Sequence, residues 1–168
     1  ELLKTLVDPN ECPLRSPPRD ERDLTIAARN SYVLSFNNLS SVNPWMSDAF
    51  CRLSTGGGYA TRQLYTDDSE LIFTGKRPIL LNGIGDIADR EDLLDRTLLV
   101  TLPVIPPSKR KEEAVLRSQF EQLRPGILGA LFEAISCGLR NLPNVNLKQL
   151  PRLADFAKFM TAAEPALG

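Results

Sequence analysis

Three short runs of apolar residues limit the possible folds of this chain more than any other feature. They cover residues 32–36, 78–81 and 97–102, and within each run the apolar residues follow one another instead of alternating with polar ones. Short continuous runs of this kind are typical of strands that are buried on both faces of a parallel sheet. Helical spacing at residues 20–29 and 47–53 flanks the first run. The sequence therefore predicts an α/β fold with a parallel sheet.

Capping and turn signals place the other elements of this part of the chain. Residues 10–19 contain several prolines and predict a loop. Asp20 and Ser47 each stand at the start of a helical run and are predicted to cap it. Residues 60–65 and 70–75 alternate on either side of a short polar turn, which predicts a β-hairpin.

The pattern changes near Pro103. No strand pattern follows it. Ser108 is predicted to cap a long helical region that is interrupted at Pro125, and residues 151–163 predict a last helix. The sequence thus divides into an α/β part, residues 1–103, and an all-helical part, residues 104–168.

The composition excludes several classes of protein. Histidine is absent, so neither a Ser-His-Asp triad nor a histidine-containing metal site can form. The formal net charge is -1, so a surface that binds nucleic acid has to be local. The 3 cysteines are far apart, which argues against a disulfide framework and fits a reducing compartment.

The sequence shows no signal peptide and no apolar run of about 18 residues, so we expect no membrane partner and a cytoplasmic location. Both ends of the sequence are abrupt, and we expect the chain to be a piece of a longer protein.

Polar residues mark the places where the predicted strands end. Asn37 and Asn38 follow the first strand, Asn82 ends the second, and Arg96 stands directly before the third. In an open parallel sheet, ligands bind outside the carboxyl ends of the strands. The sequence therefore predicts a site on this rim, although asparagine after a strand is also an ordinary turn residue.

The order of these parts resembles the core of a superfamily 3 helicase of the phage and plasmid primase-helicase type, within the AAA+ group of P-loop ATPases. V-L-S-F-N-N stands where that family has its Walker B strand, and C-R-L-S-T-G-G-G-Y-A-T-R resembles the helix and Thr-Gly-Gly turn that follow. P-I-L-L-N-G resembles the sensor-1 strand, and D-L-L-D-R resembles the arginine-finger segment. The resemblance implies a P-loop NTPase-like sheet that lacks its first strand, followed by a helical lid.

The resemblance also implies a role for each rim residue. Asn37 would contact ATP and hold Mg²⁺ through water, and Asn38 would orient the attacking water. Asn82 would be the sensor-1 residue, whose amide donates to the γ-phosphate. Arg96 would be an arginine finger that reaches a neighbouring subunit, which implies a homo-oligomeric ring. Arg152 would be the sensor-2 arginine, in contact with the nucleotide.

Simpler interpretations of two of these residues stay open. Asn82 and the glycine after it can form a plain turn. Arg96 can pair with Asp92 or Asp95 at the surface.

The chain departs from the helicase pattern at two points. Walker B strands of this family end in carboxylates, whereas Asn37 and Asn38 carry no charge, so we expect slow or absent hydrolysis unless Asp48 or an upstream residue substitutes. The phosphate loop G-x-x-x-x-G-K-[ST] does not occur in the sequence. We therefore expect the chain to begin after the Walker A loop and to be inactive by itself.

The predicted hairpin carries candidate DNA-binding residues. Arg62 and Tyr65 precede its turn, and Lys76 and Arg77 follow it. In ring helicases such hairpins line the channel, where cations neutralise phosphates and a tyrosine can stack on a base. The tip at residues 67–70 is acidic and repels phosphate. A purely structural hairpin therefore stays an alternative.

A second basic group, Arg15, Arg19 and Arg22, surrounds the proline-rich loop. It can touch a neighbouring subunit or DNA, although such charges more often form a solvated face.

The function that follows from the resemblance is the C-terminal part of an ATP-dependent DNA helicase or primase-associated ATPase of a mobile element. Its cofactors would be ATP and Mg²⁺, and its partners single-stranded DNA and a primase. The alternative is a degenerate ATPase-like module that serves as a nucleotide-binding switch or as a structural component of a replication complex. A third hypothesis, an ATP-independent DNA-binding domain, is disfavoured by the near-neutral charge.

Overall fold

The computed structural model describes residues 1–57, 59–62 and 70–168. It divides into two compact units, Glu1–Leu98 and Leu99–Gly168. The first unit is mixed α/β and the second is helical. We describe each unit by itself.

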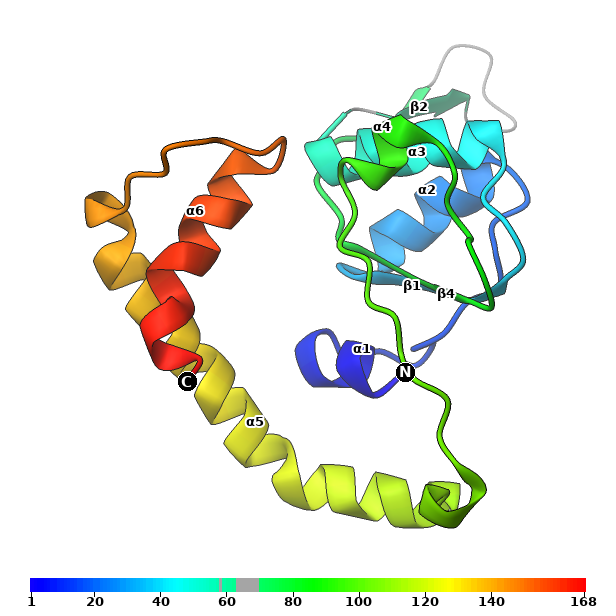
Figure 1. Ribbon diagram of the computed structural model, residues 1–168. Coiled ribbons are helices and arrows are strands. Elements are labelled where there is room, and N and C mark those ends of the chain that lie inside the picture. The colour runs from blue at the N-terminus through cyan, green and yellow to red at the C-terminus, as the bar shows by residue number, and fades with distance from the viewer. Residues whose placement is uncertain (58, 63–69) are drawn as a thin grey trace. The chain divides into compact units, whose positions relative to one another are not determined.

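The sheet of the first unit is built on two parallel strands, β1 (Leu34–Leu39) and β4 (Ile79–Gly83), seen in Figure 1. Leu34 lies opposite Ile79, and Phe36 lies opposite Leu81. The prediction of parallel pairing between these two segments is confirmed, and β1 extends further than expected.

The other edge of β1 is occupied by Arg15, in a segment predicted to be a loop. The backbone N–H of Arg15 donates to the carbonyl of Ser35 (2.9 Å), and the N–H of Asn37 donates to the carbonyl of Arg15 (3.0 Å). Because alternate residues of a strand direct their backbone groups to opposite edges, β1 pairs with Arg15 on one side and with β4 on the other. The order across the sheet is therefore Arg15, β1, β4.

Two helices cover one face of this sheet: α2 (Glu21–Asn30) and α3 (Pro44–Thr55) lie on the same side of β1 and β4 in Figure 1. The core forms where their apolar faces meet the strands. Phe36 of β1 stacks on Phe50 of α3 with ring centroids 5.6 Å apart. Each fully buried aromatic or aliphatic side chain here contributes about 1.5–3 kcal/mol, so this layer holds the unit together.

The starts of the two helices follow capping rules, but not always with the expected residue. Asp20 caps α2 as predicted, since its carboxylate accepts from the N–H of Asp23 (2.8 Å). The cap of α3 is Asn43, which accepts from Met46 (3.0 Å). The prediction of Ser47 as a cap is wrong: it lies inside the first turns of the helix, buried, and its hydroxyl has no partner among the described residues.

A short first helix, α1 (Leu2–Val7), is joined to the sheet through Asp8. The Asp8 carboxylate accepts from the Lys4 ammonium (2.5 Å) and from the N–H of Val33 (2.7 Å), and Lys4 is only 1% exposed. These hydrogen bonds, chiefly the one from Lys4, lower the pKa of Asp8. The ion pair therefore anchors the entry of β1.

The predicted hairpin is confirmed in its strands. β2 (Tyr59–Arg62) and β3 (Glu70–Phe73) are antiparallel, with Tyr59 opposite Phe73 and Arg62 opposite Glu70. The turn between them lies outside the described residues.

The predicted third buried strand, residues 97–102, is wrong. After the short helix α4 (Glu91–Leu94) the chain has no regular structure there, and Leu98, Leu99, Val100 and Leu102 are between 64% and 81% exposed. A strand needs a neighbour to satisfy its backbone groups, and within the described residues this segment has no strand partner. Apolar composition alone did not make it part of the sheet.

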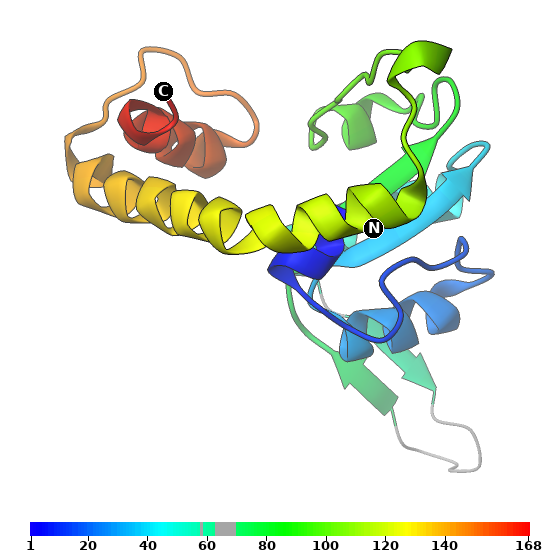
Figure 2. The same ribbon diagram turned by 90° about the horizontal axis from the view of Figure 1, so that it is seen from below.

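The second unit consists of α5 (Glu113–Asn141), α6 (Ala154–Ala163) and three short 3₁₀ helices at Pro107–Lys109, Leu142–Asn144 and Glu164–Ala166. Figure 2 shows α6 beside the second half of α5. The contact is close at Gly138, where a built Cβ would lie 2.8 Å from the Phe159 ring. Two predictions are wrong here. α5 begins at Glu113 rather than at a Ser108 cap, and it continues through Pro125.

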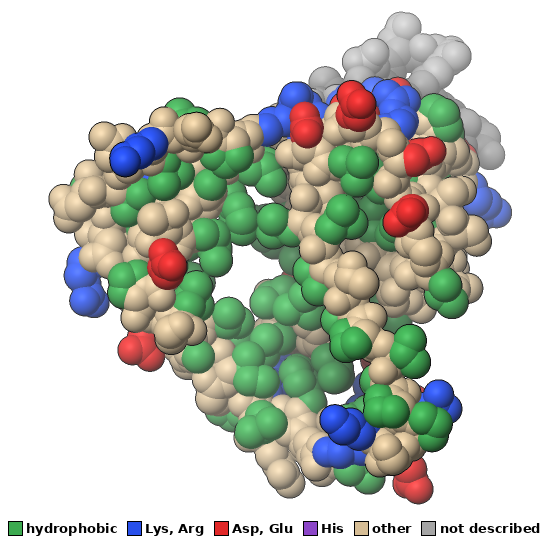
Figure 3. All heavy atoms as spheres, in the orientation of Figure 1, with side chains coloured by type: hydrophobic (Ala, Val, Ile, Leu, Met, Phe, Trp, Pro, Cys, Tyr) green, Lys and Arg blue, Asp and Glu red, His purple; other side chains and the backbone are tan. Residues whose placement is uncertain are grey.

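Many apolar side chains of the second unit stay at its surface, as Figure 3 shows, among them Leu123, Phe132 and Leu139 of α5. None of the described helices is long and apolar enough to span a membrane.

Candidate functional site

The candidate site begins with an irregularity at the carboxyl end of β1. The pairing register with β4 shifts between Phe36 and Leu39, and Asn38 has a positive φ of 59°. Asparagine tolerates this left-handed conformation better than most residues, because its short polar side chain can bond locally. Bulges of this kind redirect side chains and are over-represented next to functional sites. The two asparagines of β1 thus leave the regular ladder at the rim of the sheet.

Asn82 of β4 lies next to this bulge. Its side-chain Nδ2 donates to Oδ1 of Asn37 at 2.9 Å. Asn37 is half-buried, whereas Asn38 and Asn82 are exposed. The structure therefore brings Asn37 and Asn82 together, as the positions of the strand ends predicted.

The chemistry of this amide pair is limited to neutral hydrogen bonding. After their mutual contact, the Nδ2 of Asn37 can still donate and the Oδ1 of Asn82 can still accept. Such groups suit a phosphate oxygen or a water molecule. They offer Mg²⁺ no negatively charged ligand, and within the described residues no group of three or more Asp, Glu or Cys side chains is placed to hold a metal.

Arg96 lies over the end of α4 instead of extending from the surface. Its Nη1 donates to the backbone carbonyl of Asp92 and lies 3.8 Å from the Cys51 sulfur. Burial raises the pKa of the Cys51 thiol, while the positive charge of Arg96 opposes this shift. The simpler interpretation of Arg96 named the correct neighbour, Asp92, but the contact is with its main chain. The arginine-finger role stays a prediction.

Asp48, which the sequence offered as a substitute for the missing acids, is held by an ion pair. Its Oδ1 lies 3.0 Å from Nη2 of Arg90, and Arg90 also contacts Asp92 at 3.2 Å. Asp48 and Asp92 are therefore both paired with Arg90.

Of the residues predicted to bind DNA, Arg77 has a structural role. Its Nε donates to the carbonyl of Ala28 (2.8 Å), and its guanidinium lies 5.5 Å from the centre of the Tyr32 ring. These contacts join the end of α2 to the start of β4. Lys76 beside it is exposed.

Three further residues were predicted to contact DNA or the nucleotide. Arg62 belongs to β2, and Tyr65 lies outside the described residues. Arg152 is exposed and precedes α6 in the second unit.

A comparison with protein families decides the identity of the chain. The model of the actinomycete integrative conjugative element replication protein family matches residues 1–168. The chain belongs to this family. No curated protein and no solved structure matches it. A role in the replication of a mobile element is therefore supported, in agreement with the coarser part of the sequence-based hypothesis.

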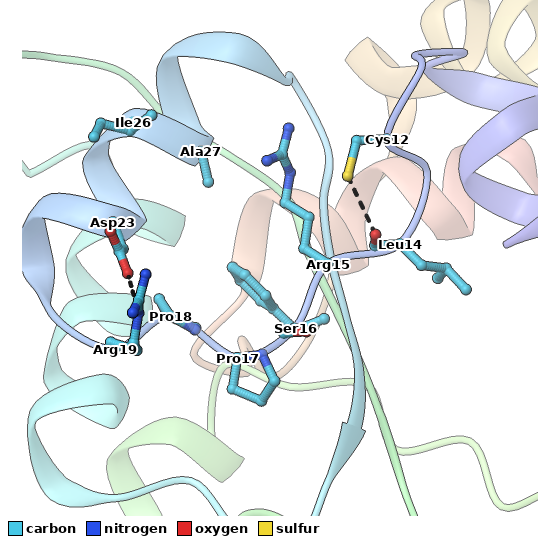
Figure 4. Close-up of a pocket in the computed structure, with 11 residues that line it drawn as sticks. Cys12, Leu14, Arg15, Ser16, Pro17, Pro18, Arg19, Asp23, Ile26 and Ala27 are labelled. Atoms are coloured by element: carbon cyan, nitrogen blue, oxygen red, sulfur yellow. Dashed lines mark hydrogen bonds and ion pairs between the residues drawn. The ribbon is translucent and has the colours of Figure 1, made fainter.

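Sequence reasoning missed one feature of this replication protein. The segment around Arg15 adds to the sheet, and together with α2 it borders a hollow with a cavity volume of about 480 Å³ (Figure 4). The hollow lies on the opposite edge of β1 from the amide pair. The signal for it was the pair of arginines that flanks the prolines in R-S-P-P-R, which predicted a loop with a basic group but no hollow.

Proposed function

We propose that this replication protein works as an ATP-dependent DNA helicase or primase-associated ATPase of the AAA+ type. The observation that carries the proposal is the 2.9 Å hydrogen bond between Asn82 and Asn37 at the carboxyl ends of two adjacent parallel strands. This is where open α/β sheets bind their ligands. ATP bound at this rim would supply the energy for movement along DNA.

In this proposal the two amides act on the terminal phosphate. The free donor of Asn37 would contact a phosphate oxygen, and the acceptor of Asn82 would contact the water that attacks it. Mg²⁺ would be held through water at Asn37, a weak arrangement because the amide has no charge. The phosphate loop would come from sequence beyond these 168 residues, since the pattern is absent from them.

Single-stranded DNA is the proposed partner, contacted by the exposed Lys76 and by Arg62 of the hairpin. The proposed ring requires Arg96 to reach a neighbouring subunit. For that, its guanidinium must release the Asp92 carbonyl.

A second candidate is a nucleotide-binding switch without turnover. It is favoured by the chemistry of the pair: both amides are neutral, and Asp48 is already paired with Arg90 at 3.0 Å. Because neither amide carries a charge, nucleotide can bind through hydrogen bonds while hydrolysis lacks its metal position.

The test is ATP binding and turnover by the complete replication protein, with and without single-stranded DNA. The motor proposal expects DNA-stimulated turnover that Asn37→Ala lowers by about 100-fold, the usual loss when one donor to the transition state is removed. Asn146→Ala, which changes an exposed asparagine of the second unit, serves as the control. Nucleotide binding without turnover, with activity gained in Asn37→Asp, would favour the switch. Absence of nucleotide binding would refute both.

A further inference from the structure

The hollow beside Arg15 is a candidate binding site that the proposed ATPase role does not use. Its walls come from the extended segment before α2 and from α2 itself. Figure 4 shows Arg15 on one side, Arg19 on the other, and Ile26 and Ala27 of α2 facing the same space. A volume of about 480 Å³ lies within the usual range of small-ligand pockets, which is roughly 300–1,000 Å³.

Arg15 has donors that the protein leaves unused. Its Nη2 makes a long contact of 3.3 Å with the Ser31 hydroxyl. Its Nε is buried and has no hydrogen-bond partner among the described residues. Buried guanidinium groups are normally satisfied, and the acceptors that surround Arg15 among the described residues do not satisfy this one.

Arg19 supplies the second cation at the rim of the hollow. Its side chain is 90% exposed and its Nε lies 3.2 Å from the Asp23 carboxylate. Two arginines and one aspartate line the hollow, which leaves it with one net positive charge. Between them the lining is apolar, with Pro17 and Ile26 among its members.

We propose that this hollow binds one nucleotide unit of single-stranded DNA, with the phosphate between Arg15 and Arg19 and the sugar and base against the apolar wall. The planar guanidinium matches the oxygens of a phosphate and donates in pairs. The site rests on the replication role of the family and on the geometry of the hollow, and it requires no ATP turnover.

The open form of the hollow favours a continuous strand over a free nucleotide. Pockets for small ligands enclose most of the ligand surface, whereas Arg19 stands almost fully in solvent at the edge of this one. A strand can place one unit in the hollow while its neighbours continue along the surface. An acidic peptide is less suited, because its carboxylate side chains leave the apolar lining, Pro17 and Ile26 among it, uncovered.

The first experiment measures binding of a labelled oligothymidine to the complete replication protein over a range of salt concentrations. Arg19→Gln should weaken binding about tenfold and reduce the slope of log K against log salt by about 0.7, the value for one phosphate contact in a single strand. Arg29→Gln is the matched control, since Arg29 is an exposed arginine of α2 that does not line the hollow. It should change binding less than twofold. Equal losses in the two variants would overturn the proposal.

Arg15→Lys tests the second arginine without removing its charge. It should weaken binding, because lysine cannot donate a planar pair of hydrogen bonds. Thermal unfolding of this variant shows whether the fold is retained. Alkylation of a cysteine in the hollow gives a second readout that needs no substitution.

Cys12 lines the hollow and is exposed, so its thiol reports occupancy directly. Saturating oligothymidine should slow alkylation of Cys12 and leave Cys137 of the second unit unchanged. Unchanged alkylation of Cys12 at saturation would overturn the proposal. Equal protection by ADP or by a polyglutamate peptide would also overturn it, by assigning the hollow to another ligand.

The same samples separate this inference from the ATPase proposal. Protection of Cys12 with no ATP turnover would support the hollow and remove the motor. DNA-stimulated turnover that Arg19→Gln does not change, with Cys12 unprotected, would support the motor and remove the hollow as a DNA site.

Discussion

Replacement of Gly138 by alanine tests how tightly α6 packs on α5. A Cβ at this position would lie 2.8 and 2.9 Å from two carbons of the Phe159 ring and 3.3 Å from the Ala163 Cβ. Carbon atoms in good contact are about 3.5–4.0 Å apart, so the ring would have to withdraw by most of an ångström. Overpacking of this kind costs roughly 1–3 kcal/mol.

Gly129→Ala is the matched control, because Gly129 lies in the same helix and a Cβ there meets nothing within 4 Å. Both substitutions gain about 1 kcal/mol of helix propensity. This gain cancels in the comparison, so the two variants should differ by the overpacking cost alone, roughly 1–3 kcal/mol. Gly129→Ala should stabilise the unit, and Gly138→Ala should leave it unchanged or destabilise it.

The assay uses Cys137, whose sulfur lies 3.7 Å from the carbonyl of Ala162 in α6. Opening of α6 exposes this thiol, so its alkylation rate reports the local stability even if the two units unfold separately. The rate should be higher in Gly138→Ala than in Gly129→Ala by about tenfold for each 1.4 kcal/mol. Equal rates, or a slower rate in Gly138→Ala, would refute the reasoning that the helices meet closely at this glycine.

Three further predictions concern the first unit. Asp8→Asn should lower the free energy of unfolding by about 3 kcal/mol at neutral pH, because it leaves a buried lysine unpaired. Because the pKa of Asp8 is lowered in the folded state, this stabilisation is complete above about pH 5 and lost as the pH falls below about 4. Urea unfolding at these two pH values should show that the free energies of unfolding of the natural protein and of Asp8→Asn differ less in acid. A difference that grows in acid would contradict the assignment. Asn43→Ala should lower the free energy of unfolding by about 1 kcal/mol through loss of the α3 cap. Ser47→Ala should be neutral or stabilising, because it removes an unpaired buried hydroxyl. If thermal unfolding gives the reverse order of stability, Ser47 is the cap. In native protein, mass spectrometry should find Cys12 alkylated well before Cys51, since Cys51 is buried and its thiol pKa is raised; comparable rates would show that Cys51 is accessible.

Local sequence patterns predicted the parallel strands β1 and β4 and the site at their ends, because each strand is specified by residues that neighbour one another in the chain. The continuous apolar runs before Asn37 and Asn82 were sufficient to define two strands, and parallel pairing then brought these asparagines within 2.9 Å. The hairpin strands followed from alternation in the same way. These features needed no knowledge of distant parts of the chain.

The wrong predictions concern positions where two capping residues compete for one helix start, a proline inside a helix, and a segment that would need a neighbouring strand. Asn43 and Ser47 are both good capping residues, and Pro44, which suits the first position of a helix, marks Asn43 as the cap. Pro125 lacks an N–H and normally ends a helix, yet α5 continues through it. Residues 97–102 have the composition of a strand but no neighbour to pair with among the described residues.

The sequence by itself determined β1, β4, the hairpin strands and the helices α2 and α3, because these depend on apolar periodicity and capping over a few residues. It also determined the neutral chemistry of the rim, because asparagine stands where carboxylates would be required. Only the tertiary structure decided which side chains meet. It placed Arg15 at the free edge of β1 beside a hollow, turned Arg96 back onto Asp92, and used Arg77 to join α2 to β4. The contacts of Arg15 and Arg77 join residues far apart in the chain, and their geometry is set by packing of the whole unit rather than by any local pattern.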